Sequence, residues 1–376
     1  MRKIFLLVAA AALLMSCGGG AKVKVSNPLK IARTDETVEI SWQEVQSKVS
    51  DATPENIVVI APDGTQQPSQ VIYNGGTEPQ ALIFQATVPG NGSETYTLQT
   101  GRRETYPAQA FGRFVPERMD DFAWENNLIA HRMYGPALEA TGEISNGIDI
   151  WLKRTDSLII DKWYAPGFNY HADHGEGLDC YKVGRTLGAG AMAPYAKDSL
   201  WLGNNYIRYK VLDNGPIRIA FQLDYAPFLA DTVLVTERRT ISLDANTHFN
   251  RITEEYAGDF DNLKVAAGIV TRGAGGKVLD ILNKPIKMVG YWEPLNTDNE
   301  PDNGHTTIGL VFPCEIKVET RLGHLLGSTT IPQGKPFTYQ MGAGWSKSDV
   351  PTPEAMTQLI FDQSLKSENP LIVTVK

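Results

Sequence analysis

Residues 206–258 read YIRYKVLDNGPIRIAFQLDYAPFLADTVLVTERRTISLDANTHFNRITEEYAG, and this stretch decides the fold class. It contains four long runs rich in Val, Ile, Thr and Tyr, which begin near Tyr206, Ile217, Val233 and Phe249. The turn signals DNGP and LDANTH separate neighbouring runs. Runs of this composition between turn residues are typical of antiparallel strands. We therefore predict a sheet of long strands here.

The same pattern extends from this stretch over residues 110–376. Further strand-like runs are GIDIWLKR, LKVAAGIVT and TTIGLVF. Two ordinary immunoglobulin-like sandwiches would also produce such runs, but strands of this length fit one large antiparallel β-supersandwich of two extended sheets better. The only helix we expect lies near PEAMTQLIFD, residues 353–362.

Shorter strands precede this large domain. VKVSNPL, TVEISW, NIVVIAP, QVIYN, QALIFQATVP and TYTLQT are separated by Pro, Gly, Asn or Asp, as in a small sandwich. We therefore predict an all-β protein, with a small N-terminal β-sandwich over residues 23–105 and the large β-sandwich over 110–376. The segment GRRETYPAQAFGRFVPER, residues 101–118, is expected to link the two.

The N-terminus has the features of a secretory signal. Arg2 and Lys3 precede an apolar run from Ile4 to Leu14, and LMSC then places Cys17 directly after a small-residue cleavage site. This resembles a bacterial lipoprotein signal, which predicts removal of residues 1–16, a lipid on Cys17 and a flexible tether over 17–22. The apolar run is shorter than the ~20 residues of a membrane-spanning helix. We expect an anchor in the cell envelope, facing the periplasm rather than the outside.

The net charge limits the molecules that the protein is expected to bind, and the cysteine content raises the question of a disulfide. Without residues 1–16 the chain has 33 basic and 43 acidic side chains, so a nucleic-acid partner is not expected. A small anionic substrate needs only a local group of arginines and stays possible. Cys180 and Cys314 would lie in an oxidising compartment, where they either form a disulfide or stay free.

Three clusters in the large domain carry candidate chemistry. The first is FAWENNLIAHRMYGPAL, residues 122–138, where Arg132 and Tyr134 point to one face of a strand and can hold a carboxylate. Arg132 paired with Glu125 in the core is the alternative. The second is NYHADHGEGLDCYKVG, residues 169–184, continued by Arg185. The third is GAGWSKSD, residues 342–349. Trp124 and Trp345 are candidates for stacking against a sugar, and Trp345 could instead cap the core.

The second cluster allows several interpretations. His171 and His174 with Asp173 and Glu176 are candidate ligands for one divalent metal ion, Zn²⁺ or Mn²⁺. Ca²⁺ on Asp173, Glu176 and Asp179 is a second possibility. A polar turn without metal, or an acid/base role for one of the histidines, would explain the same residues.

The motifs AWENNLIAHRMYGPALEA and GFNYHADHGEGLDCYKVGRTLGAGAMAPY, with the small domain that begins near NPLKIAR, resemble a family of Bacteroidetes lipoproteins designated only as a domain of unknown function. The resemblance covers nearly the whole chain after Cys17, and where the family has WEND this chain has Asn127. Its genes occur in polysaccharide-utilisation loci. The resemblance implies a large sandwich like those of sugar mutarotases and polysaccharide lyases, and an oligosaccharide dehydratase activity of the kind that acts in ulvan breakdown.

Such a dehydratase would remove water across C4 and C5 of a terminal uronic acid in an anionic oligosaccharide. It needs a base for the C5 proton, a cation at the carboxylate and an acid for the departing hydroxyl. His171 or His174 suits the base, Arg132 and Arg185 the carboxylate, and Tyr134 or Tyr181 the acid, with Glu125 beside them. A metal ion at the histidines would replace the arginines. The alternatives are a glycoside hydrolase with paired carboxylates, a mutarotase-like epimerase and a non-catalytic glycan-binding lipoprotein.

Overall fold

The computed structural model of the protein describes residues 20–273, 275–281, 284–295 and 302–376. The predicted signal peptide and the lipidation site Cys17 lie outside these ranges. Strands dominate the described chain and pair antiparallel, except for one isolated parallel bridge between Ile148 and Gly188. The prediction of an all-β protein is confirmed. Within the described ranges, no helix is both long and apolar enough to span a bilayer.

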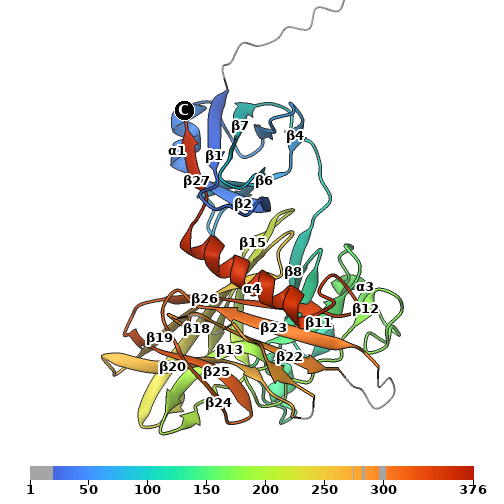
Figure 1. Ribbon diagram of the computed structural model, residues 1–376, viewed down its shortest axis with the longest axis vertical. Coiled ribbons are helices and arrows are strands. Elements are labelled where there is room, and N and C mark those ends of the chain that lie inside the picture. The colour runs from blue at the N-terminus through green and yellow to red at the C-terminus, as the bar shows by residue number, and fades with distance from the viewer. Residues whose placement is uncertain (1–19, 274, 282–283, 296–301) are drawn as a thin grey trace, which may run out of the picture.

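A small β-unit forms the upper part of the molecule in Figure 1. One of its sheets has the strand order β27-β1-β7-β3-β4 and the other β2-β6-β5. Alternate residues such as Val23, Val25 and Leu98 meet in a shared core, where Phe84 packs on Tyr96. The elements are β1 (Ala21–Ser26), β2 (Arg33–Ser41), α1 (Trp42–Lys48), β3 (Ile57–Ile60), β4 (Gln66–Gln67), β5 (Ser69–Ile72), β6 (Ala81–Val88), β7 (Ser93–Thr100) and β27 (Ile372–Val375).

The largest sheet of the protein lies in the lower part of Figure 1 and has nine strands. Its order is β15-β16-β18-β19-β26-β23-β22-β21, and β17 pairs with β18. On β18 the burial alternates, so Ile241 and Leu243 enter the core while Ser242 and Asp244 face outward. The strands are β15 (Tyr206–Asn214), β16 (Arg218–Tyr225), β17 (Phe228–Ala230), β18 (Val233–Asp244), β19 (Phe249–Gly258), β21 (Lys277–Val278), β22 (Met288–Pro294), β23 (His305–Val311) and β26 (Phe337–Trp345).

Two five-stranded sheets share one hydrophobic core with this nine-stranded sheet, and together they form the large β-unit. One has the order β12-β11-β10-β9-β8 and the other β14-β13-β20-β25-β24. Their strands are β8 (Ala110–Val115), β9 (Asp121–Asn126), β10 (Ile129–Met133), β11 (Asp149–Lys153), β12 (Gly177–Leu178), β13 (Ala189–Ala196), β14 (Ser199–Leu200), β20 (Asn262–Val270), β24 (Lys317–Arg321) and β25 (His324–Pro332). Short helical turns are η1 (Pro116–Arg118), α2 (Pro136–Glu139) and α3 (Ile160–Trp163).

The long helix α4 (Pro353–Glu368) lies between the two units (Figure 1). Thr352 caps its start by accepting a hydrogen bond from the Ala355 amide, and Pro353 occupies the first turn. The side chain of Ile360 packs against Gly309 of β23 so closely that a β-carbon there would lie 2.3 Å from it. The helix expected near residues 353–362 is thus confirmed, although it continues to Glu368.

The C-terminal strand corrects the predicted organisation. After α4 the chain returns to the small β-unit, where β27 pairs with β1 over four residues from Val375 opposite Val23. The prediction that residues 110–376 belong to one large domain is therefore wrong at its end. The tether predicted over residues 17–22 is also too long, because β1 begins at Ala21. The partner of β27 lies more than 300 residues away in the sequence, which no local pattern indicates.

Candidate functional site

The two faces of the sheet β8–β12 have different surroundings. On β10, Ile129 and Met133 face the shared core, whereas Ala130 and Arg132 face the opposite side. That opposite side, here called the outer face, packs against residues of the segment 154–183, which includes α3 and β12. The second sequence cluster lies in this segment, and the first cluster contributes Arg132 to the same face. The structure therefore brings the two clusters together.

Arg132 lies at the centre of a buried group of carboxylates. Its Nη2 atom is 2.5 Å from Oδ2 of Asp149 and 2.9 Å from Oδ2 of Asp179, and its Nε atom is 3.8 Å from Oδ2 of Asp121. The hydroxyl of Tyr134 donates to Oδ2 of Asp149 at 3.2 Å. Arg132 and Tyr134 thus do act on one carboxylate, but it belongs to the protein. The guanidinium is buried and already paired, which does not favour Arg132 as a ligand of substrate.

Burial has a large effect on the acids of this group. It raises the pKa of Asp121 to about 7, although the charge of Arg132 opposes the shift. Burial and the nearby Asp179 raise the pKa of Asp149 to about 7 as well. Burial also raises the pKa of the Tyr134 hydroxyl. Displaced pKa values of several neighbouring groups are a common property of functional sites, although structural networks show them too.

His171 joins this buried group to the surface. Its Nδ1 atom lies 2.9 Å from the backbone oxygen of Asp179 and 3.7 Å from Oδ2 of the same residue. A carbonyl oxygen only accepts hydrogen bonds, so Nδ1 carries the proton in the neutral ring and Nε2 has the lone pair. The side chain is 61% exposed. Nε2 of His171 is therefore available to a molecule arriving from solvent.

Two further residues lie beside His171. The Tyr170 ring is 4.4 Å from the imidazole, centroid to centroid, and its hydroxyl accepts a hydrogen bond from Nε of Arg118 at 3.3 Å. The Arg118 side chain is partly exposed, and its Nη1 atom is 4.0 Å from Oδ2 of Asp121. We call this group the Arg118–Tyr170–His171 surface. It presents a cation, a phenol and an imidazole outside the carboxylates that surround Arg132.

The predicted metal ligands do not form a coordination group. Nε2 of His174 lies 3.0 Å from the backbone oxygen of Asn169, and Asp173 forms an ion pair with Arg154 at 2.5 Å. Glu176 pairs with Lys162 at 2.6 Å. In the part of the chain that the structure describes, no three His, Cys, Asp or Glu residues are placed to hold a metal ion. The residues present thus do not fit the Zn²⁺, Mn²⁺ or Ca²⁺ that the sequence suggested.

The stretch around Asp173 is instead a turn that closes on itself. Oδ1 of Asp173 accepts hydrogen bonds from the amides of Gly175 and Gly177. Gly177 has φ of 120°, and a β-carbon on it would lie 1.8 Å from the backbone oxygen of Leu152 on β11. Only glycine fits this position. The run of polar residues is therefore explained by a turn, and His171 is the member that reaches the buried carboxylates.

The aromatic residues expected to bind sugar lie in the core. Trp124 is fully buried on the core side of the sheet, where its Nε1 donates to Asn250 at 2.7 Å and its ring stacks on His131. Trp345 is 2% exposed and donates to the backbone oxygen of Asn303. Neither ring can form a surface platform. Sequence composition could not separate this core role from sugar binding.

Two other predicted site residues, Glu125 and Tyr181, also have partners within the protein. Glu125 is fully buried, pairs with Lys153 at 2.8 Å and accepts from the amides of Ile159 and Ile160 at the start of α3. Its predicted pairing with Arg132 is not formed. Tyr181 is buried, with the Arg272 guanidinium 4.1 Å from its ring centre.

Arg185 is exposed and donates to the backbone oxygens of Leu202 and Gly203. Cys180 and Cys314 are both free, so they do not form a disulfide. Burial raises the pKa of the Cys180 thiol to about 12, which leaves it unreactive. None of these three residues belongs to the Arg118–Tyr170–His171 surface.

Sequence reasoning missed Arg118, Asp121 and Asp149. Arg118 ends a segment that was interpreted as a linker, and the structure places it in η1 beside Tyr170. Asp149 is a lone acid within the apolar strand run GIDIWLKR, and Asp121 begins β9. An acid in such a run needs a buried partner, which was the available signal.

Comparisons with known proteins place this chain in a family. The profile of the family described as "Domain of unknown function (DUF4861)" matches residues 25–373. A protein of Formosa agariphila, described as "Uncharacterized protein P7", is 30% identical over 405 aligned residues, with 100% of both chains covered.

Two solved structures from Enterococcus faecalis share the fold. A protein in glycosyl hydrolase family 38 is 10% identical with a TM-score of 0.53, and an alpha-mannosidase is 8% identical with a TM-score of 0.50. Each alignment covers 95% of this chain, which spans 47% and 46% of those longer chains. At this identity the likeness concerns the fold alone.

Proposed function

We propose a carbohydrate-active function for this chain, which belongs to the family described as domain of unknown function DUF4861. The substrate we propose is an oligosaccharide that ends in a uronic acid, and the reaction is elimination of water, or of a glycan, across C4 and C5. The observation that carries the proposal is the exposed imidazole of His171, held through Nδ1 beside a buried carboxylate. The likeness of fold to glycoside hydrolases agrees with a carbohydrate substrate but does not select the reaction.

The Arg118–Tyr170–His171 surface offers the three groups that such an elimination needs. Nε2 of His171 takes the proton from C5, and the electrons of that C–H bond form the C4=C5 double bond. The Arg118 guanidinium, permanently charged, binds the carboxylate and stabilises the negative charge that develops on it. The Tyr170 hydroxyl donates its proton to the oxygen leaving C4, and the proton on His171 returns to solvent or to the phenolate.

This assignment changes the roles expected from the sequence. The base stays at a histidine of the second cluster, but the carboxylate ligand moves from Arg132 and Arg185 to Arg118. The acid moves from Tyr134 or Tyr181 to Tyr170. Arg132, Tyr134 and Tyr181 are buried, whereas Arg118 and Tyr170 are partly exposed. Arg185 is exposed, but its guanidinium donates to the backbone oxygens of Leu202 and Gly203 and does not belong to the Arg118–Tyr170–His171 surface.

His171 and His174 form a matched pair for the test. Both are exposed histidines of the same turn, but only His171 contacts Asp179. The protein is incubated with uronic-acid oligosaccharides, while ultraviolet absorbance of the unsaturated uronate and product mass are followed. We expect a product that has lost one water, a turnover about 10²-fold lower in His171→Gln and a nearly unchanged turnover in His174→Gln.

Other outcomes of the same assay would replace the proposal. A gain of water without ultraviolet absorbance would indicate a glycoside hydrolase. Binding without any product would indicate a glycan-binding protein. Equal loss of turnover in both histidine variants would remove the assignment of His171.

The location in the cell is a further part of the proposal. The signal at residues 1–16 and Cys17 support a lipid anchor in the cell envelope, with the protein facing the periplasm. An envelope enzyme would meet oligosaccharides that other enzymes have already released from a polymer.

A further inference from the structure

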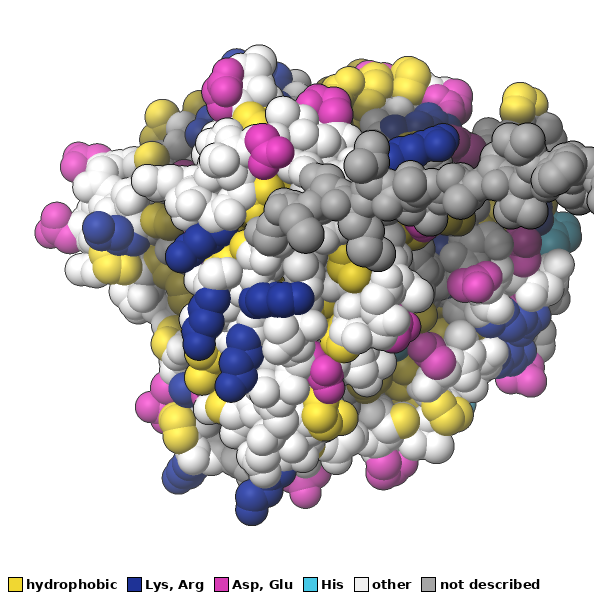
Figure 2. All heavy atoms as spheres, turned by 90° about the horizontal axis from the view of Figure 1, so that it is seen from above, with side chains coloured by type: hydrophobic (Ala, Val, Ile, Leu, Met, Phe, Trp, Pro, Cys, Tyr) yellow, Lys and Arg dark blue, Asp and Glu magenta, His cyan; other side chains and the backbone are white. Residues whose placement is uncertain are grey.

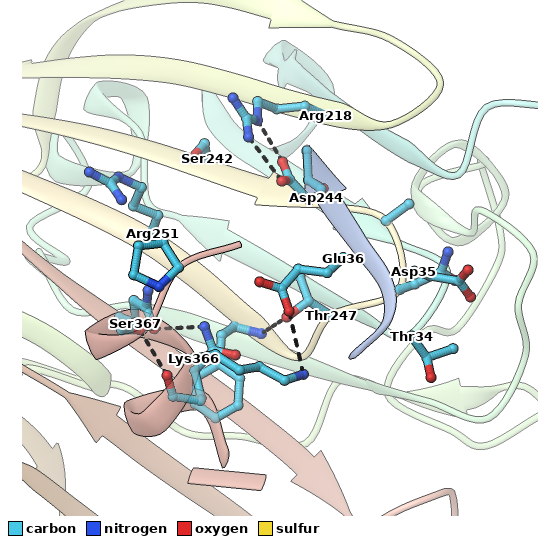
Figure 3. Close-up of a pocket in the computed structure, with 17 residues that line it drawn as sticks. Thr34, Asp35, Glu36, Arg218, Ser242, Asp244, Thr247, Arg251, Lys366 and Ser367 are labelled. Carbon is cyan, nitrogen blue, oxygen red and sulfur yellow. Dashed lines mark hydrogen bonds and ion pairs between the residues drawn. The ribbon is translucent and has the colours of Figure 1, made fainter. Parts of the chain in front are cut away.

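A polar cleft of about 360 Å³ lies where the small and large β-units meet (Figure 3). Its walls come from three places: β2 of the small unit, the outward face of β18, β19 and β26, and the last turns of α4. No residue of the Arg118–Tyr170–His171 surface lines it. Hydroxyl, amide and charged side chains predominate among the lining residues that matter here, which are Thr34, Glu36, Ser242, Arg251, Gln340 and Lys366.

The floor of the cleft is a row of side chains across three strands. Ser242 of β18 pairs with Arg251 of β19, and Arg251 pairs with Gln340 of β26. Their chain neighbours Ile241 and Ile252 point into the core, so the strand alternation directs the three polar side chains outward. The row therefore presents a hydroxyl, a guanidinium and an amide side by side on a rigid sheet.

Ion pairs account for most of the other charges in the cleft, while Asp35 accepts a hydrogen bond from the Thr87 hydroxyl. Arg218 binds Asp244 at 2.6 Å, and Glu36 lies 2.8 Å from Arg33 and 3.9 Å from Lys366. Figure 3 shows Asp244 directed at Arg218 and Glu36 at Lys366, while no contact line reaches the Arg251 guanidinium. Within the described ranges, the Arg251 side chain forms no ion pair and no hydrogen bond. Arg251 is thus a charged donor left for a ligand.

The side-chain amide of Gln340, one of the three groups in the row, is held in place by α4. Gln340 accepts hydrogen bonds from Gln363 at 2.9 Å and from the Ser367 hydroxyl at 3.2 Å, both on α4. This leaves the amide nitrogen of Gln340 to donate to a ligand. Thr34 and Ser242 add hydroxyls that both donate and accept. Such a set of groups matches the hydroxyls of a sugar ring.

From these observations we infer that the cleft is a second saccharide site, which binds one uronic-acid unit with its carboxylate on Arg251. The guanidinium binds a carboxylate through two parallel hydrogen bonds, and the volume suits a single sugar unit rather than a long chain. The ligand class rests on the proposed function, but the site itself does not depend on catalysis. A ligand held here would touch both β-units and α4.

A direct binding experiment separates the two sites. Arg118→Gln removes the carboxylate ligand of the proposed active site, so uronate binding that remains belongs to the cleft. A glucuronate-ended disaccharide and its methyl ester are titrated by calorimetry into this variant. We expect the acid to bind about 10- to 100-fold more tightly than the neutral ester, as is usual for a hydrogen bond to a charged group.

Adding Arg251→Gln to Arg118→Gln should abolish this preference, whereas adding Arg208→Gln should not. Arg208 is a suitable control because it is exposed on β15, 3.5 Å from Asp224, and does not line the cleft. Circular dichroism checks that each variant is folded. The inference fails if Arg118→Gln alone removes the preference, or if the Arg251 variant keeps it.

Turnover distinguishes this failure from failure of the proposed function. If His171→Gln loses turnover but the double variant Arg118→Gln/Arg251→Gln still prefers the acid to the ester, the cleft assignment is wrong and the proposed function stands. If the double variant loses the preference for the acid but the unmodified protein converts no uronic-acid oligosaccharide, the cleft assignment stands and the proposed reaction is wrong.

Discussion

Oδ2 of Asp179 lies 2.9 Å from Nη2 of Arg132 and 3.7 Å from Nδ1 of His171, so one carboxylate joins a buried cation to an exposed imidazole. Asp179 is itself buried and fixed by Arg132. The orientation of His171 therefore depends on a residue that substrate cannot touch. Asp179 is a positioning residue in the proposed reaction.

The first prediction follows from this link. In Asp179→Asn, Arg132 keeps Asp149 as a partner, so the protein should fold, but an amide replaces the carboxylate whose Oδ2 lies 3.7 Å from Nδ1 of His171. We expect kcat to fall about tenfold or more with KM nearly unchanged, since the group acts on proton transfer. A variant with normal kcat would show that the contact is only structural.

The second prediction concerns Arg132. Replacing it with Gln leaves the buried Asp149 and Asp179 without their cation, and breaking a buried ion pair in this way typically costs about 3–5 kcal/mol of unfolding free energy. Urea denaturation measures this loss. Arg154→Gln is the control, because Arg154 and Asp173 form a partly exposed pair whose removal should cost about 1 kcal/mol or less. A stable Arg132 variant that lost only substrate binding would restore the role expected from the sequence.

The third prediction is a loss of stability between pH 6.5 and 8. Burial raises the pKa of Asp121 and Asp149 to about 7 and that of Glu237, a neighbour of Arg239 in the core, to about 8. Carboxyls of the unfolded chain titrate near pH 4. Above that pH the folded protein holds more protons, so its stability falls as pH rises through these pKa values.

The range from pH 6.5 to 8 is chosen because the buried His131 has the opposite effect on the unfolding free energy at lower pH. Burial lowers the pKa of His131 to about 3, so its protonation in the unfolded chain costs stability only below about pH 6.5. Urea titrations at pH 6.5, 7 and 8 should show a falling unfolding free energy, by about 1.4 kcal/mol per pH unit for each extra proton bound. Glu237→Gln should reduce the slope. A constant or rising value would contradict the pKa shifts.

Strand content was predictable because it is a local property. The run VLVTERRTISLDA became β18, and the segment PEAMTQLIFD became the first part of α4. Composition and turn residues determine such elements without knowledge of their partners. The strand β27 was not predicted, because its four residues gain their role only by pairing with β1 at the other end of the chain.

The candidate site was predictable only as a region. The sequence indicated that His171 and Arg132 act together, and the structure places both at Asp179. The burial of each side chain was not predictable. It depends on strand pairing and on the segment 154–183, which packs over the outer face of the sheet and decides whether an arginine there contacts solvent or a carboxylate. For the same reason the buried Trp124 was expected at the surface, and the partly exposed Arg118 was overlooked.

The fourth prediction tests the lipid anchor. If Cys17 carries the lipid, Cys17→Ala should leave an unprocessed precursor or a soluble form that no longer enters the detergent phase in Triton X-114 partitioning. Cys314→Ala is the control, because Cys314 is a free thiol in the large β-unit and its loss should not change the partitioning. Unchanged detergent partitioning of the Cys17 variant would remove the anchor from the proposal.

The last prediction concerns cleavage between the two β-units. Limited proteolysis should cut within residues 101–109, which lie between β7 and β8 without strand pairing. The two fragments should nevertheless stay together on size-exclusion chromatography. The C-terminal fragment contributes β27 to the small sheet, and Arg33 of the N-terminal fragment donates to the backbone oxygens of Lys366 and Asn369 at the end of α4. A chain that lacks residues 371–376 loses the β27 pairing but keeps the Arg33 contacts and others between the units, such as Asp213 with the amide of Tyr73. After the same cut its fragments should separate at a lower urea concentration than those of the full chain. Separation of the fragments in the full chain would show that β27 does not hold the units together.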